Sequence, residues 1–252
     1  MLAISFFRQS SGGFYEPVFT LDNFGRFLSP FFAKVLTVSV SFSAGAAAIA
    51  VAIAFPFTYL LVQMSGRAQA VALVFLLSVL SLSEVIIGFS WSTILSQTAG
   101  IGNILAGLGL ISESRSFSPS SGALLTALVY LGFPYSVLVI YPAMSRLDPE
   151  IPEAARMCGA SPVRTFFTTV VPMMRNTITG ALILVFVFTL GAYILPQTLG
   201  RPQDWTLSVH ITDQAVFQSN LPFASAMSIF LLLVSLALVG LSMLLGQTET
   251  KR

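Results

Sequence analysis

Long stretches without a charged residue constrain this chain more than any other feature. Four of them exceed the ~20 apolar residues that a transmembrane helix needs: 35–66, 116–145, 176–200 and 214–248, with 32, 30, 25 and 35 uncharged residues. A fifth, from about Ala70 to Leu95, carries one charge near its centre, that of Glu84. Charged residues make up 9% of the chain, against about 25% in soluble domains. The runs also lack the alternation of a β-barrel. The sequence therefore predicts an all-α polytopic membrane protein with five clear transmembrane helices.

The chain outside these spans is short. Residues 1–34 are predicted to be an extracytoplasmic, interfacial segment, because "MLAISFF" is too short to cross a bilayer; alternatively, it is the remnant of a truncated sixth helix. Residues 35–246 form the predicted transmembrane domain, with a polar loop at 146–175, and residues 247–252 form a cytoplasmic tail. The first span is rich in Ser, Gly and Ala. Because small residues let helices approach closely in lipid, we expect this span to lie inside the bundle.

Lysine and arginine indicate the orientation, because they are enriched in cytoplasmic loops. With five spans, one side of the membrane receives five basic residues: Arg8, Arg26, Lys34, Arg115 and Arg201. The other side receives seven: Arg67, Arg146, Arg156, Arg164, Arg175, Lys251 and Arg252. The excess places the polar loop and the C-terminus in the cytoplasm, and residues 1–34 outside.

The polar loop contains residues that predict two short helices. Glu150 and Glu153 suit the positive N-terminal end of the first helix, and Gly159 is placed to end it in a left-handed conformation. Ser161 followed by Pro162 suits the start of the second helix, as cap and first residue. A small alanine-faced helix of this kind fits a groove on another protein, although a well-capped solvated loop explains the same residues.

The segment "EAARMCGASPVRTFFTTVVP" resembles the cytoplasmic EAA signature of permeases of binding-protein-dependent ATP-binding-cassette (ABC) importers. That signature has Glu-Ala-Ala, three residues, Gly, nine residues and then Ile-any-Leu-Pro. Thr169 and Val171 depart from the Ile and the Leu, which concerns the packing of the second helix. The segments "WSTILSQTAGIGNILAGLGLI", "LGAYILPQTLG" and "LPFASAM" are similar to the spermidine/putrescine-type subgroup. The matching residues of the signature are Glu153, Ala154, Ala155, Gly159 and Pro172.

This resemblance implies a type I ABC importer permease bundle, multi-pass in a bacterial inner membrane. Its first polar-loop helix would be a coupling helix on a cytoplasmic ATPase dimer, and the five matching residues would couple to that ATPase. A second permease subunit, usually a paralogue in polyamine-type systems, and an extracytoplasmic solute-binding protein are the other implied partners, beside membrane lipid. The chain contains no Gly-x-x-x-x-Gly-Lys-Ser/Thr phosphate loop. We therefore expect no enzyme activity and no cofactor in this chain, with ATP and Mg²⁺ used by the partner ATPase.

Glu84 is the most suggestive side chain within the predicted spans. A carboxylate at mid-bilayer costs at least about 2.5 kcal/mol on insertion scales, so it should face the bundle interior, a partner or water. One interpretation is a pathway residue that favours a cationic solute, polyamine-like or amino-acid-derived, with Trp91 and Tyr193 lining the same passage. The other is a hydrogen bond between helices, with both aromatic rings as packing or interface anchors.

Other chemistry has less support. A stand-alone secondary transporter or channel, the alternative hypothesis, would need intramembrane charge pairs or coupling-ion residues, yet Glu84 is the one ionisable residue deep in a predicted span. "GFSWS" around Ser90 resembles an intramembrane serine protease superficially, but the sole histidine, His210, lies in a polar loop. His210 and the sole cysteine, Cys158, indicate no metal site. A net charge of +2 indicates no nucleic-acid partner.

Overall fold

The described part of the chain is helical. A computed structural model describes residues 1–10, 15–26, 29–98, 100–109 and 115–248. Within these ranges, the β-structure consists of one isolated bridge between Arg8 and Glu16. The prediction of an all-α protein is confirmed. The predicted tail 247–252 falls mostly outside the described residues.

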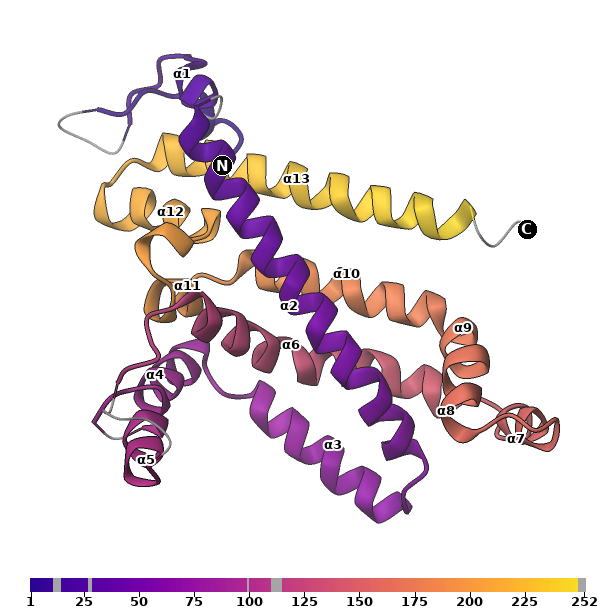
Figure 1. The fold of residues 1–252 in the computed structure, drawn as a ribbon. Coiled ribbons are helices and arrows are strands. Elements are labelled where there is room, and N and C mark those ends of the chain that lie inside the picture. Colours follow the sequence, from indigo (N-terminus) through magenta and orange to yellow (C-terminus); the bar gives the residue numbers. More distant parts are fainter. Residues whose placement is uncertain (11–14, 27–28, 99, 110–114, 249–252) are drawn as a thin grey trace.

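Five long helices run between two ends of the molecule (Figure 1). Three of them, α2, α6 and α10, pack on one another at the centre. In Figure 1, α3 and α13 flank this centre on opposite sides. The bounds of the five are α2 (Pro30–Val62), α3 (Gly66–Leu80), α6 (Ser121–Met144), α10 (Arg175–Gly191) and α13 (Leu221–Thr248).

The prediction of five clear spans needs a correction. Among the described residues, three helices are long and apolar enough to cross a membrane unbroken: α2, α6 and the Leu221–Gly240 part of α13. Two bent pairs bring the number to five if each pair is one span. In the first pair, α3 meets α4 (Glu84–Ile94) at 95°, and in the second Pro162–Met173 meets α10 at 74°. The length of an uncharged run indicates that it could cross a membrane, but it does not show whether the helix bends within the run.

The small residues of α2 place this helix inside the bundle, as predicted. Ala46, Ala50 and Ala54 are completely buried. On α6, a Cβ atom at Gly132 would lie 2.6 Å from Cγ1 of Val185 on α10 and 3.3 Å from the Cβ of Ala50. Only a glycine at position 132 lets the three helices come this close. In lipid, where no hydrophobic effect drives helices together, such close packing stabilises the bundle.

Short elements gather at the two ends of the long helices (Figure 1). We call one the α11 end; it comprises α4, α5 (Ile101–Gly107), α11 (Ile194–Leu199), η4 (Pro202–Asp204), α12 (Leu207–Thr212) and η5 (Asp213–Phe217). The other is the α7 end; it comprises α7 (Glu150–Met157), α8 (Pro162–Thr165), the π-helical segment η3 (Phe166–Val170) and α9 (Val171–Met173). Near the start of α13 lie η1 (Ile4–Phe6) and α1 (Asp22–Gly25).

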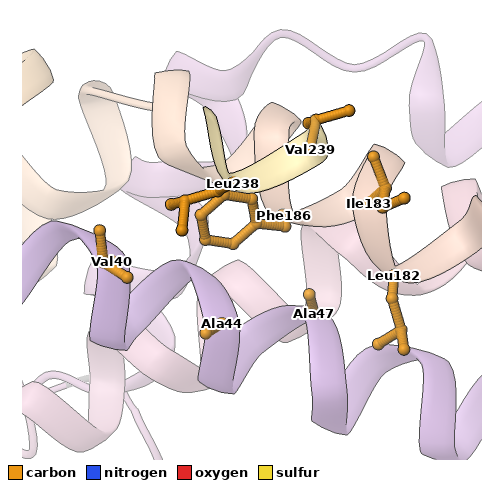
Figure 2. A pocket seen from close by; sticks show the side chains of 8 residues that line it. All are labelled: Val40, Ala44, Ala47, Leu182, Ile183, Phe186, Leu238 and Val239. Carbon is orange, nitrogen blue, oxygen red and sulfur yellow. The ribbon is translucent and has the colours of Figure 1, made fainter. Parts of the chain in front are cut away.

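Helix α13 is the most loosely packed of the three unbroken spans. Its apolar window is 28% buried, whereas that of α6 is 56% buried. A groove of about 280 Å³ opens between α2, α10 and α13, and Figure 2 shows side chains of all three helices around it. Its lining is entirely apolar: Val40, Ala44, Ala47, Leu182, Ile183, Phe186, Leu238 and Val239. The groove offers a solute no polar side chain, and its lining suits contact with lipid.

Candidate coupling segment and solute pathway

Helix α7 is a short, self-contained helix that ends as the sequence predicts. Glu150 and Glu153 lie in its first turn, where the positive end of the helix dipole stabilises their negative charges. Gly159 has a φ of +88°. Its N–H donates to the Arg156 carbonyl at 2.9 Å, and the Ala160 N–H donates to the Ala155 carbonyl at 3.2 Å. These two bonds form a Schellman motif, which needs a left-handed residue at the position of Gly159.

The second predicted helix is also present, but it changes character after one turn. The Ser161 Oγ accepts the Arg164 N–H at 3.3 Å, which confirms the predicted cap. After Thr165 the chain widens into the π-helical segment η3. Pro172 follows in α9; it has no N–H to donate and its ring crowds the carbonyl four residues earlier. The wider turn is one way to accommodate such a proline.

The structure groups most of the predicted coupling residues on α7. Glu153 and Ala154 are exposed, Ala155 is half-buried, and Gly159 is exposed at the end of the helix. Pro172 is exposed too, but it lies on α9, beyond η3. The sequence analysis did not single out Met157, whose side chain is 89% exposed on α7. An exposed methionine suits a binding surface, because its flexible side chain adapts to a partner.

Glu84 lies at a helix break rather than inside a continuous span. It is the first residue of α4, and the preceding Ser83 caps that helix by accepting the Val85 N–H at 3.3 Å. The Glu84 Oε1 accepts the N–H of Leu195, on α11, at 3.4 Å. The positive end of α4 also favours the carboxylate. The break therefore provides partners for a charge that a continuous helix would leave in lipid.

A pocket of about 110 Å³ lies beside Glu84. Tyr130 and Tyr135 of α6 line it together with Glu84. Trp91 does not line this pocket, but its ring packs edge-on against that of Tyr130, with centroids 5.7 Å apart. Tyr193 precedes α11 and is 36% exposed. The three predicted pathway residues thus all lie at the α11 end, on or next to α4 and α11.

The arrangement at Glu84 allows two roles. A carboxylate beside two tyrosines suits an ammonium group, which binds both to negative charge and to aromatic faces. The hydrogen bond to Leu195 also ties α4 to α11. The sequence analysis missed Tyr130 and Tyr135, since nothing distinguishes them from other aromatic residues of a span. Within the described residues, no group of three His, Cys, Asp or Glu side chains that could hold a metal ion occurs.

The amino-acid sequence identifies the family of this chain. Residues 24–248 match the family described as "Binding-protein-dependent transport system inner membrane component", and the chain belongs to this family. It is therefore an inner-membrane permease component of the bacterial ABC importers, a family in which the ATPase is a separate subunit.

Several bacterial permeases are similar to this chain over most of its length. The spermidine/putrescine transport system permease protein PotB of Escherichia coli (strain K12) is 26% identical over 234 residues, which are 93% of this chain and 85% of the relative. PotB of Haemophilus influenzae is 26% identical over 239 residues, 95% of this chain and 84% of the relative. The diacetylchitobiose uptake permease NgcF of Streptomyces coelicolor is 28% identical over 187 residues, 67% of this chain and 52% of the relative.

Solved structures share the fold. A bacterial ABC transporter that imports the acidic polysaccharide alginate has a TM-score of 0.77 at 18% identity, covering 92% of this chain and 85% of that one. The alginate transporter in complex with an alginate-bound periplasmic protein has a TM-score of 0.69 at 19% identity, covering 88% and 81%. At this identity the likeness establishes the type of bundle and not the solute.

Proposed function

We propose that this chain is the permease subunit of an ATP-driven, binding-protein-dependent importer of a small cationic solute, polyamine-like or amino-acid-derived. It pairs with a second permease subunit, a paralogue, to form the passage. A cytoplasmic ATPase dimer docks at the α7 end and uses ATP and Mg²⁺, while this chain binds no cofactor. An extracytoplasmic solute-binding protein delivers the solute at the α11 end.

The observation that carries the coupling role is α7 itself. It is a capped helix that projects from the bundle (Figure 1), with Glu153, Ala154 and Gly159 exposed. Its Schellman ending fixes the helix length, so it can act as a rigid handle rather than a flexible loop. Small side chains allow close approach, and Glu153 offers a charge-assisted hydrogen bond to a donor on the ATPase. Pro172 belongs to the same role through η3, which it helps to shape.

The pocket at Glu84 supports a cationic solute. Glu84 supplies the negative charge, and Tyr130 and Tyr135 supply aromatic faces for an ammonium group. Two of the relatives are named for spermidine and putrescine, which are cations. NgcF is named for a neutral sugar and the solved transporter for an acidic one. Family membership therefore leaves the solute open, and the charge at Glu84 is what favours a cation here.

The test is isolation of the complete transporter from its native host. A tagged form of this chain should co-purify with an ATPase and a second permease. After reconstitution into liposomes with the soluble binding protein, the complex should take up labelled putrescine or spermidine only with MgATP on the ATPase side. Uptake by this chain alone without ATP would instead establish the stand-alone transporter. Direct binding measurements on the soluble protein then identify the solute.

A further inference from the structure

Helix α7 contacts the rest of the polar loop more than it contacts α2. It packs on α8 and η3. Between α7 and the end of α2 lies a pocket of about 310 Å³, lined by Tyr59 and Gln63 of α2 and by Glu153 and Arg156 of α7 among others. A displacement of α7 would therefore act on η3, which it contacts, before it acts on α2.

Phe166, the first residue of η3, packs against α2. The Phe166 ring packs against two aromatic rings of that helix, with its centroid 5.4 Å from that of Phe55 and 5.2 Å from that of Tyr59. Phe55 and Tyr59 are four residues apart, so they lie on one face of α2, and Phe55 is 4% exposed. We call these three residues the Phe166 clasp. It is a packed contact between the polar loop and the central helix of the bundle.

The backbone on both sides of the clasp is suited to bending. In α2, Pro56 lies between the two clasped residues and cannot donate the hydrogen bond that holds an α-helix at that point. On the other side, Phe166 begins the π-helical segment η3, and π-helical turns are frequent at functional sites. The Thr165 hydroxyl beside it is buried without a partner. A buried unpaired hydroxyl is unfavourable, so a second conformation of this segment that satisfies it would be stabilised.

We propose that Phe166 is a positioning residue that transmits movement of α7 to α2, by displacing Phe55 and Tyr59 and bending α2 at Pro56. This inference rests on the proposed docking of an ATPase at α7. It assigns Phe166, one residue after α8, a role that the EAA-like residues themselves do not include. The aromatic contact transmits the movement, because a bulky ring packed against two others displaces both when it moves.

The test uses the complete transporter, with its ATPase, second permease and binding protein, in liposomes. A spin label at Met64→Cys in a Cys158→Ser background reports on α2, because Met64 follows the end of that helix and is 55% exposed. MgATP with orthovanadate should change the mobility of this label. Phe166→Ala should abolish the change while the ATPase still co-purifies, and should raise ATP hydrolysed per putrescine taken up by about tenfold.

The adjacent Phe167 provides a matched control. It has the same side chain, is 64% exposed and touches the Phe166 ring edge-on. Phe167→Ala should keep the label response, and Phe166→Tyr, which keeps the ring, should restore it. If Phe166→Ala does not assemble, Phe166→Leu keeps an apolar side chain and should assemble with a weakened response.

The outcomes separate this inference from the proposed function. A label response in assembled Phe166→Ala or Phe166→Leu equal to that of the parent would overturn the clasp and leave ATP-driven import standing. A parent complex that neither retains an ATPase nor responds to MgATP would overturn the proposed function itself.

Discussion

The two ends of the helix bundle are joined to its core by different interactions. At the α11 end, buried or partly buried hydrogen bonds link different helices. The Leu207 N–H donates to the Ser39 Oγ at 2.8 Å, and the Ser208 hydroxyl donates to the Leu190 carbonyl at 2.7 Å. Glu84 adds the bond to Leu195 between α4 and α11. These bonds are directional and low in exposure, so they fix the relative positions of the short helices.

At the α7 end, the side-chain hydrogen bonds of the described polar loop are local. Asp148 accepts the Glu150 N–H and Ser161 accepts the Arg164 N–H. The contacts of this loop with the core are apolar: Phe166 packs against Phe55 and Tyr59 of α2, and Val170 is buried in the same cluster. Packing between rings is less directional than a hydrogen bond, so α7 can shift against the core while the α11 end keeps its shape. This difference agrees with the proposed function, in which an ATPase moves the α7 end and the passage at the α11 end keeps its geometry.

Removing the left-handed residue at the end of α7 should have the largest effect. Gly159→Leu forces a side chain into a φ of +88°, which costs roughly 1–2 kcal/mol, and adds bulk to the docking surface. ATP-driven uptake should fall by about 100-fold. The measurements are uptake in liposomes and co-purification of the ATPase.

Two further variants separate conformation from docking. Gly159→Asn tolerates a positive φ but adds bulk, so it should also impair docking. Gly66→Asn adds the same side chain at the start of α3, where a Cβ meets nothing within 4 Å and φ is not positive, and it should leave uptake unchanged. Normal uptake by Gly159→Leu would contradict a close contact at α7.

At the α11 end, Glu84→Gln should reduce uptake of a cation by about tenfold, since hydrogen bonds to charged groups contribute roughly 1.5–3 kcal/mol. Gln keeps an oxygen that can accept the Leu195 N–H, so assembly and ATPase co-purification should be unaffected. Initial rates of putrescine uptake provide the measurement.

Glu84→Ala is the companion variant, because it removes both the charge and the acceptor. If Gln transports normally while Ala lowers thermal stability, Glu84 only ties α4 to α11 and takes no part in the pathway.

The sequence predicted the α7 end better than the α11 end, and the reason is physical. Helix caps are local, because Gly159 and Ser161 act on residues within four positions. Their effects can therefore be predicted from the neighbouring residues in the sequence. The break before Glu84 and the tyrosines beside it depend on contacts between α4, α6 and α11, which are distant in the chain. The Phe166 clasp likewise joins residues more than 100 positions apart. Local pattern does not contain such contacts.

Asp204 allows a smaller test of the contrast between the two ends. It is 7% exposed, and its Oδ2 accepts the Ser121 hydroxyl at 2.9 Å and the Arg201 N–H at 3.3 Å. Asp204→Ala leaves both donors without this acceptor, which should lower the free energy of unfolding by about 1–3 kcal/mol. Asp148→Ala, at the exposed α7 end, should cost less. Thermal unfolding of the two variants in one detergent compares them, and equal losses would argue against a more firmly fixed α11 end.

The smallest expected effect is a pH dependence at His210 in α12. Burial lowers the pKa of this imidazole, and nearby Asp213 partly opposes that shift. As the pH falls below the ordinary value of about 6.5, the unfolded chain takes up a proton that the folded protein resists. Stability should therefore decrease on acidification and be unaffected above neutral pH. His210→Phe keeps a ring against Phe31 and Trp205 but cannot titrate, so its unfolding temperature should fall less between pH 7.5 and pH 5.5. An identical fall in both proteins would remove His210 as the cause.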